Sequence, residues 1–244
     1  MKATPAVPPT HEDPRKAQAV REMFGRIAHR YDFLNHCLSG NIDRRWRRVF
    51  RREVAARLGI RPARILDVGC GTGDLSVEFA EVAPVFGCDF SHPMLTIGAK
   101  KAGAAATRHP VAMLEGDALR LPFADSTFDS AVSAFVLRNL ADLRAGILEM
   151  RRVVRPGGVL GVLEFGMPRT PVLGTVYEFY FTRVLPRIGS LISGVKGPYT
   201  YLPESVRAFP PPERLCELIE ACGFRQARSR LLTGGIAIIV TAEV

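Results

Sequence analysis

The stretch Ile65-Leu66-Asp67-Val68-Gly69-Cys70-Gly71-Thr72-Gly73-Asp74 decides the fold of this chain. An apolar run between Arg64 and Gly69 is typical of a buried parallel strand. The glycines at 69, 71 and 73 let the backbone bend sharply and approach a ligand closely. A helical pattern follows, and the N-terminus of a helix offers free backbone N–H groups. The stretch therefore predicts a strand, a ligand-binding turn and a helix.

The spacing and the charge of this turn indicate its ligand. A dinucleotide-binding turn has the pattern G-x-G-x-x-G, whereas the third glycine comes one residue earlier here. The carboxylates of Asp67 and Asp74 flank the turn and would repel a pyrophosphate. S-adenosylmethionine carries a sulfonium and an ammonium group, which carboxylates attract. The turn therefore favours S-adenosylmethionine, with Asp67, Gly69, Gly71 and Gly73 as candidate binding residues.

Two more acids end apolar runs further along the chain. Asp89 closes the run 85–89, twenty residues after Gly69, and could accept hydrogen bonds from both ribose hydroxyls. Asp117 follows the run that ends at Glu115 and could accept a hydrogen bond from the adenine amino group. In the alternative interpretation, Asp89 and Asp117 merely cap the helices that follow them. Acids at the ends of three successive strands favour the cofactor site.

The composition of the chain fits one cytoplasmic α/β domain with an N-terminal extension. Its 244 residues are 47% hydrophobic, enough for one full core. The five cysteines (37, 70, 88, 216 and 222) form no C-x-x-C pair, so the sequence predicts neither a disulfide framework nor a metal site. Residues 1–14 lack the apolar core of a signal peptide, and no apolar run is long enough to span a membrane.

The formal net charge of +9 is concentrated early in the chain. Residues 44–52 are densely basic, and Trp46, Val49, Phe50, Val54 and Leu58 share one face at helical spacing. Such an amphipathic helix could contact an anionic membrane surface. Alternatively, it packs on the domain as a lid helix whose arginines are simply solvated. Nucleic acid is the weakest of these interpretations, because no stacking aromatic residues interleave the basic run.

The remaining pattern alternates strands and helices. Residues 16–33 read as a helix that folds over the carboxyl ends of the strands, and residues 35–41 read as a turn. We predict strands at 64–68, 85–89, 111–115, 128–135, 159–165, 225–231 and 236–242, the last two as a hairpin. We predict helices at 73–82, 91–101, 142–153 and 213–222. The apolar, aromatic stretch 171–194 reads either as a core helix or as part of an apolar pocket.

With these residues in view, the chain resembles the class I methyltransferases. It is more narrowly similar to the quinone C-methyltransferases that methylate demethylmenaquinol or the ubiquinol precursor. The motifs that carry the resemblance are Tyr31-Asp32-Phe33-Leu34-Asn35, Leu137-Arg138-Asn139, Leu163-Glu164-Phe165, Leu185-Pro186-Arg187-Ile188-Gly189, Tyr201-Leu202-Pro203-Glu204-Ser205-Val206 and Phe209-Pro210. The resemblance covers the chain from about residue 20 to residue 242.

The resemblance implies a Rossmann-like, mostly parallel seven-stranded sheet with an antiparallel C-terminal strand. We expect a disordered tail at 1–15, a helical lid at 16–62 and a methyltransferase domain at 63–244, with an apolar substrate-side insertion at about 171–210. By similarity, Thr72, Asp89, Asp117 and Ala118 would contact the cofactor. Two positions depart from the family pattern, because Ala134 replaces a frequent serine and Val136 replaces a glycine. The expected reaction is carbon methylation of a prenylated hydroquinone, either a naphthoquinol or a benzoquinol.

Such a reaction needs a hydroquinone whose hydroxyl loses its proton, which makes the neighbouring ring carbon nucleophilic. Arg138 is expected to hold the developing phenolate or a water; alternatively it pairs with a nearby acid. Tyr31 and Tyr201 are the other catalytic candidates, with Asp32 and His36 beside them. The prenyl tail would lie along the apolar stretch, and the basic helix would bring the enzyme to the inner face of the membrane. Competing hypotheses are another apolar acceptor, such as a sterol or polyketide, and a basic RNA-binding module.

Overall fold

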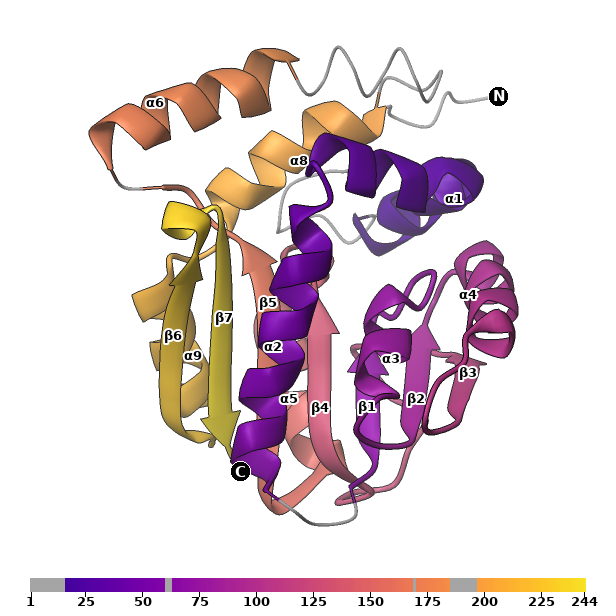
Figure 1. Ribbon diagram of the computed structural model, residues 1–244. Helices are drawn as coiled ribbons and strands as arrows, with labels where there is room; N and C mark the ends of the chain where they lie inside the picture. The colour runs from indigo at the N-terminus through magenta and orange to yellow at the C-terminus, as the bar shows by residue number, and fades with distance from the viewer. Residues whose placement is uncertain (1–15, 60–62, 169, 185–196) are drawn as a thin grey trace.

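The computed structural model describes residues 16–59, 63–168, 170–184 and 197–244 (Figure 1). Its centre is a seven-stranded sheet with the strand order β3-β2-β1-β4-β5-β7-β6. All four residues of β1 are buried, as expected of a strand covered on both faces. The strands are β1 (Ile65–Val68), β2 (Val85–Asp89), β3 (Val111–Glu115), β4 (Phe128–Ala134), β5 (Val154–Phe165), β6 (Arg225–Leu232) and β7 (Ala237–Glu243).

The pairing of the strands confirms the predicted sheet. β1 pairs in parallel with β2 and β4, β2 pairs in parallel with β3, and β4 pairs in parallel with β5. β7 runs antiparallel to both β5 and β6, so the C-terminal hairpin closes the sheet. The carboxyl ends of β1 to β5 therefore meet at one edge of the sheet, where ligands of such folds bind.

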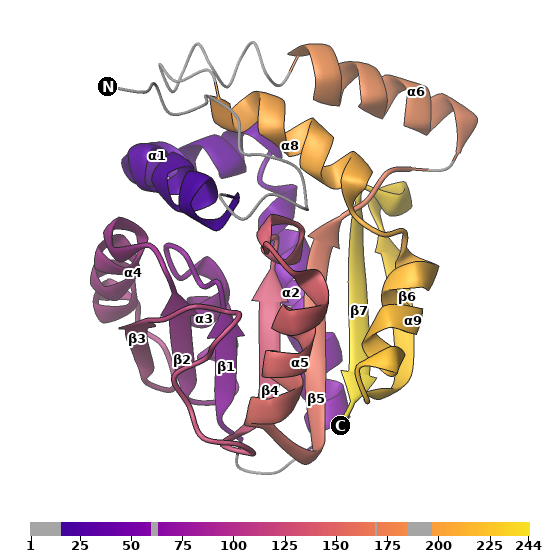
Figure 2. The ribbon, with the colours of Figure 1, turned by 180° about the vertical axis from the view of Figure 1, so that it is seen from behind.

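Helices cover both faces of the sheet (Figures 1 and 2). On one face lie α2 (Ile42–Leu58) and α3 (Asp74–Phe79), and on the other lie α5 (Leu143–Val153) and α9 (Pro212–Ala221). The predicted apolar face of α2 packs against the sheet, since Trp46, Phe50, Val54 and Leu58 are buried in one core cluster. The second core cluster joins α5 and α9 to the opposite face through Ile147, Met150, Leu215 and Ile219.

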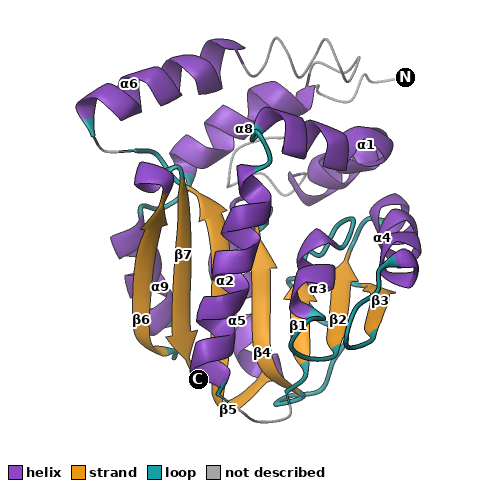
Figure 3. Cartoon of the chain, viewed as in Figure 1, coloured by secondary structure: helices purple, strands orange, loops and turns teal. Residues whose placement is uncertain are grey.

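Three helices lie beyond the carboxyl ends of the strands (Figure 3). These are α1 (Lys16–Leu38), α6 (Pro171–Phe179), which continues into the π-helical turn η2 (Tyr180–Val184), and α8 (Gly197–Ala208). α1 contacts α8, as well as α4 (His92–Ala104) at the edge of the sheet. The short helices η1 (Leu137–Asn139) and η3 (Thr233–Gly235) complete the described elements.

Several boundaries differ from the sequence predictions. The predicted turn at 35–41 is wrong at its start, because α1 continues to Leu38 and the chain reverses at Gly40 and Asn41, where φ is +60° and +64°. The helix predicted at 73–82 ends at Phe79. β5 begins at Val154, five residues before the predicted strand start at 159, because the turn expected at 155–158 is a bulge within the strand, with Gly157 at φ +73°. The motif at 185–189 and the tail at 1–15 lie outside the described residues.

Candidate active site

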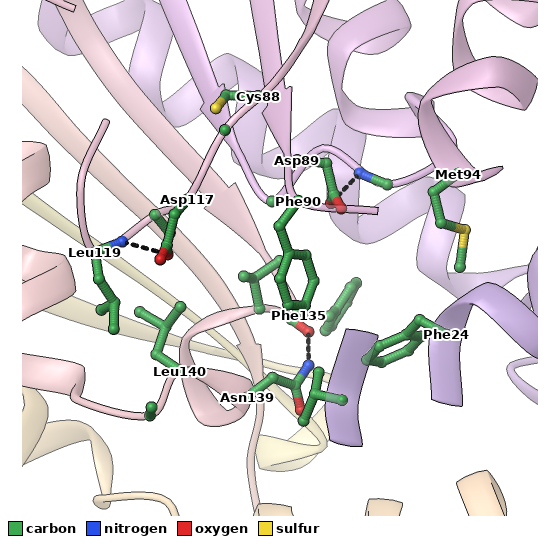
Figure 4. A pocket seen from close by; sticks show the side chains of 17 residues that line it. Phe24, Cys88, Asp89, Phe90, Met94, Asp117, Leu119, Phe135, Asn139 and Leu140 are labelled. Carbon is green, nitrogen blue, oxygen red and sulfur yellow. Dashed lines mark hydrogen bonds between the residues drawn. The ribbon is translucent and has the colours of Figure 1, made fainter. Parts of the chain in front are cut away.

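A pocket lies at the carboxyl ends of the strands, next to α1 (Figure 4). It encloses about 760 Å³, with its open mouth included. The glycine turn after β1 and the ends of β2, β3 and β4 form its walls, and α1 adds Val20 and Phe24. The other lining residues are Gly69, Gly71, Cys88, Asp89, Phe90, Met94, Gly116, Asp117, Ala118, Leu119, Phe135, Val136, Asn139, Leu140 and Ala141. Two carboxylates and no basic side chain are among these residues.

The glycine turn has the conformation that its sequence requires. Gly69, Gly71 and Gly73 have φ values of +70°, +53° and +80°, which other residues rarely adopt. Gly69 also has no room for a side chain, since a Cβ there would lie 2.4 Å from Cγ1 of Val136. Val136, the residue that replaces a family glycine, lines the pocket, and its side chain packs directly against the glycine turn. Gly73 does not line the pocket, although it holds the turn in shape.

Asp89 joins the end of β2 to the glycine turn. Its Oδ2 accepts a hydrogen bond from the Gly71 N–H at 2.8 Å, and its Oδ1 accepts one from the Ser91 N–H at 2.8 Å. Each oxygen keeps a second lone pair, so the carboxylate can still accept hydrogen bonds from a ligand in the pocket. Burial raises the pKa of Asp89 above its usual range, although these hydrogen bonds oppose the shift.

Asp117 lies in the loop after β3, and Figure 4 shows it pointing toward the same space as Asp89. Its Oδ1 accepts a hydrogen bond from the Leu119 N–H at 2.9 Å. Neither carboxylate is a helix N-cap residue, because α4 begins after Ser91 and the chain after Asp117 forms a turn. The helix-cap interpretation of these two acids is therefore wrong, and both remain available to a ligand.

Asp67 is buried behind the turn and does not line the pocket. Its Oδ2 accepts a hydrogen bond from the Ser76 hydroxyl at 2.6 Å, whereas its Oδ1 has no hydrogen-bond partner among the described residues. Burial raises the pKa of this carboxyl to about 7. A buried acceptor without a partner is costly, and a cationic ligand nearby would favour its ionised form.

Asp74 and Thr72 do not face the pocket but join a network of charged side chains. Asp74 accepts hydrogen bonds from Lys101 at 2.6 Å and pairs with Arg47 at 3.2 Å. The Thr72 hydroxyl donates to Asp32 of α1 at 2.5 Å, and Lys101 also pairs with Asp32 at 2.5 Å. Asp74 is thus held in ion pairs outside the described pocket lining, and its attraction for the cofactor stays a prediction. Asp32 and Thr72 fasten α1 to the glycine turn.

Arg138 sits in η1, directly after β4, and is only 5% exposed. Its guanidinium Nη1 donates to Glu164 Oε2 at 2.8 Å, and its backbone N–H donates to Glu164 Oε1 at 3.3 Å. The alternative sequence interpretation, an ion pair with a nearby acid, is therefore confirmed. The Nε–H of Arg138 still has no partner among the described residues, so the guanidinium keeps one donor for a ligand.

Lys16 was missed by the sequence analysis. It is 1% exposed, and its Nζ donates to the carbonyl oxygens of Arg138 at 3.1 Å and Leu140 at 2.7 Å. Burial and the charge of Arg138 lower the pKa of Lys16 to about 8. The available signal was its spacing, because Lys16, Val20 and Met23 fall on one helical stripe and the other two are apolar.

Of the other two catalytic candidates, the structure describes the side chain of Tyr201 only. Tyr201 of α8 is buried against Val20 and Met23 of α1, and its hydroxyl has no hydrogen-bond partner in the described part of the chain. The side chains of Tyr31 and His36 lie outside the described residues. The site therefore has two adjoining parts, and η1 contributes to both. One part is the carboxylate-lined pocket, and the other is a polar cluster of Arg138, Glu164 and Tyr201.

The residues that line the pocket fit a cationic nucleoside better than a nucleotide. Two carboxylates lie on the wall, a third with an unpartnered oxygen is buried behind the turn, and the described lining residues include no basic side chain. This arrangement would repel a phosphate. The apolar walls suit a flat ring. Among the described residues, no three His, Cys, Asp or Glu side chains are grouped as metal ligands.

Comparison with known proteins identifies relatives over most of the chain. The model of the ubiE/COQ5 methyltransferase family matches residues 12–243. A protein of Deinococcus radiodurans named demethylmenaquinone methyltransferase is 50% identical over 94% of each chain. A protein of the same name from Thermus thermophilus is 50% identical over 89% of this chain and 97% of its own. A Geobacter sulfurreducens protein named ubiquinone/menaquinone biosynthesis C-methyltransferase UbiE is 43% identical over 93% of this chain and 89% of its own.

Solved structures share the fold at low sequence identity. A possible histamine N-methyltransferase of Thermotoga maritima superposes with a TM-score of 0.60 at 19% identity, covering 91% of this chain and 98% of its own. The [4+2]-cyclase SpnF superposes with a TM-score of 0.63 at 20% identity over 97% of each chain. Since a cyclase shares the fold with methyltransferases, the fold alone does not determine the reaction. No described helix is long and apolar enough to cross a bilayer.

Proposed function

Because the chain belongs to the ubiE/COQ5 methyltransferase family, we propose that it methylates a ring carbon of a prenylated hydroquinone, demethylmenaquinol, to form menaquinol. The methyl donor is S-adenosylmethionine, which supplies an electrophilic methyl group on a positively charged sulfur. One observation carries the proposal: a carboxylate-lined pocket adjoins a buried arginine that keeps a free donor. The first part suits the cationic donor, and the second suits an oxygen that becomes negative.

The cofactor would be held by the turn and by the strand ends. Gly69 and Gly71 would bring the backbone against it, and Asp89 would accept hydrogen bonds from its ribose. Asp117 and Ala118 would border its adenine ring. Asp67 would act through its charge from behind the turn. For Thr72 and Gly73 we propose a positioning role, since the first bonds to α1 and the second shapes the turn.

The acceptor would react as its hydroquinone form. The hydroxyl proton leaves to water, the ring carbon next to that oxygen takes the methyl group, and the ring hydrogen then leaves as a proton while the oxygen regains one. Menaquinol would thus form with the net release of one proton, which balances the positive charge that the donor sulfur would lose. Arg138 would stabilise the negative oxygen, and Tyr201 and Tyr31 would assist from the lid. Glu164 is poorly placed to act as the base, because it is fully buried and its carboxylate already accepts three hydrogen bonds, two from Arg138 and one from the Phe165 N–H.

The prenyl tail and the membrane extend this proposal. We place the tail along α6 and η2, where Tyr177 and Phe181 belong to an apolar cluster. The exposed arginines of α2 would hold the enzyme at the anionic inner face of the membrane, where such tails reside. They are Arg44, Arg45, Arg48 and Arg52, whereas Arg47 is buried in an ion pair with Asp43 at 2.7 Å. Its charge is therefore unavailable to lipid.

A benzoquinol of ubiquinone biosynthesis is the second candidate acceptor, because the Geobacter relative's name covers both pathways. The decisive experiment measures transfer of labelled methyl groups from S-adenosylmethionine to reduced demethylmenaquinol, beside its oxidised quinone and the reduced demethylated benzoquinol. We expect transfer to the reduced naphthoquinol and none to the quinone. Normal methylated menaquinone in a deletion strain, or equal labelling of oxidised and reduced forms, would contradict the proposal.

A further inference from the structure

Three buried hydrogen-bond donors near Arg138 have no partner among the described residues. They are the Nε of Arg138 in η1, the hydroxyl of Tyr177 in α6 and the hydroxyl of Tyr201 in α8. The three residues are 5%, 8% and 6% exposed. A buried polar group without a partner costs about 1 to 3 kcal/mol, so native proteins leave few of them. Three such groups from three elements indicate that something outside the described chain completes them.

The charge of one guanidinium acts on both phenols. The positive charge of Arg138 lowers the pKa of Tyr177 and of Tyr201, and the negative charge of Glu164 raises that of Tyr201. Burial outweighs these charges and raises the pKa of Tyr201 to about 12, and that of Tyr177 well above its usual range. Both phenols therefore keep their protons at neutral pH and can donate them in hydrogen bonds.

Aromatic rings connect this cluster to the cofactor pocket. Phe135 lines the pocket and stacks on Phe165 with ring centroids 4.4 Å apart. The guanidinium of Arg138 lies over the Phe165 ring, with the Cζ of Arg138 5.2 Å from the ring centroid. Phe181 is 6.4 Å from Phe165 and stacks on Tyr177 at 4.9 Å. The cluster thus adjoins the place where the methyl group would be transferred.

The groups without a partner in this cluster are donors. The carboxylate of Glu164 is fully buried and already accepts three hydrogen bonds, from the Arg138 side chain, the Arg138 backbone and the Phe165 backbone. Among the described residues, the Nε–H of Arg138 and the two phenol O–H groups are left to donate. This set matches an oxygen that gains negative charge on a flat aromatic ring.

We propose that Tyr177 and Tyr201, together with Arg138, bind the substrate oxygen next to the methylated carbon and stabilise it as it loses its proton. The inference rests on the proposed function, because it assigns that oxygen to a hydroquinone.

The test compares Tyr177→Phe, Tyr201→Phe and the double variant with Tyr180→Phe, which removes a phenol one residue before Phe181. Because the Tyr177 hydroxyl has no partner in the described part of the chain, Tyr177→Phe should leave the urea midpoint equal to or above that of the wild type. The affinity for S-adenosylmethionine should not change. With reduced demethylmenaquinol, we expect kcat/KM to fall about tenfold per hydroxyl, the scale of one charge-assisted hydrogen bond. Tyr180→Phe should keep the kcat/KM of the wild type, whatever the loss of the contacts of its own hydroxyl does to the urea midpoint.

The pH profile separates this role from a structural one. If the phenols stabilise the ionised substrate, their removal raises the apparent pKa of the bound hydroquinone, and the rise of kcat shifts to higher pH. A merely structural role would lower kcat equally at every pH. Unchanged kcat/KM in both single variants, or a loss that tracks a falling urea midpoint, would overturn the proposal.

A binding measurement decides the subsite even if the wild type does not methylate the naphthoquinol. The probe is 2-hydroxy-1,4-naphthoquinone, which carries an ionised ring oxygen at neutral pH, compared with neutral 1,4-naphthoquinone. In the presence of S-adenosylhomocysteine, the wild type should prefer the anion, and the double variant should lose about tenfold or more of that preference. If the preference persists in the double variant or is absent in the wild type, the subsite is refuted. Preference without turnover refutes only the proposed function.

Discussion

Replacing Glu164 by glutamine tests how the Arg138 guanidinium is held. The two side chains are 0% and 6% exposed, and they form a salt bridge of 2.8 Å. Glutamine keeps the size of the side chain and one acceptor oxygen, so the main change is the loss of the negative charge. A buried charge that loses its partner costs about 3 to 5 kcal/mol of the free energy of unfolding, against about 5 to 15 kcal/mol for a whole domain.

The assay is urea denaturation of Glu164→Gln, Arg138→Met and the double variant, followed by the fluorescence of Trp46. This is the single tryptophan of the chain, and its ring lies 6.2 Å from that of Phe165. We expect each single variant to lose about 3 to 5 kcal/mol and the double variant to lose much less than the sum, because neither charge then remains unpaired. Losses that add to within about 0.5 kcal/mol would refute the coupling.

Three other substitutions probe the pocket and its lid. Asp89→Ala should weaken binding of S-adenosylmethionine by about 1.5 to 3 kcal/mol, and unchanged affinity in calorimetry would exclude Asp89 from the ribose site. Because burial raises the pKa of Asp67 to about 7 from 3.8, the folded protein without cofactor holds a proton that the unfolded chain has lost in this range. Its free energy of unfolding should therefore fall as the pH rises from about 4 to about 7. If Asp67→Asn shows the same decrease with pH, Asp67 is not its cause. Lys16→Met removes the hydrogen bonds to the carbonyls of Arg138 and Leu140, which should cost about 1.5 to 3 kcal/mol in urea denaturation; wild-type stability would show that these bonds contribute nothing.

The sheet and the cofactor side of the site could be predicted because their determinants are local. The glycine turn needs positive φ at Gly69 and Gly71, and the apolar runs before Asp89 and Asp117 mark the strands that end at the pocket. The periodicity of α2 likewise places Trp46 in the core. Each of these features depends on residues that are neighbours in the sequence.

The contacts that tie the lid to the site could not be predicted, because they join residues far apart in the chain. The sequence places Asp74 beside the turn, but its ion pairs with Lys101 and Arg47 come from other helices. Lys16 donates a hydrogen bond to the carbonyl of Leu140, 124 residues further along the chain, and no sequence pattern predicts such a partner. Tyr177 lay in a stretch that looked purely apolar. Its relation to Arg138 depends on how α6 folds back over the strand ends.

The central claim is that acidic side chains at the strand ends select a cationic methyl donor over a phosphate-bearing nucleotide. Isothermal titration of the full chain with S-adenosylmethionine and, separately, with NAD tests it most directly. We predict a saturable heat of binding for S-adenosylmethionine and none for NAD. Saturable uptake of NAD without uptake of S-adenosylmethionine would contradict the claim.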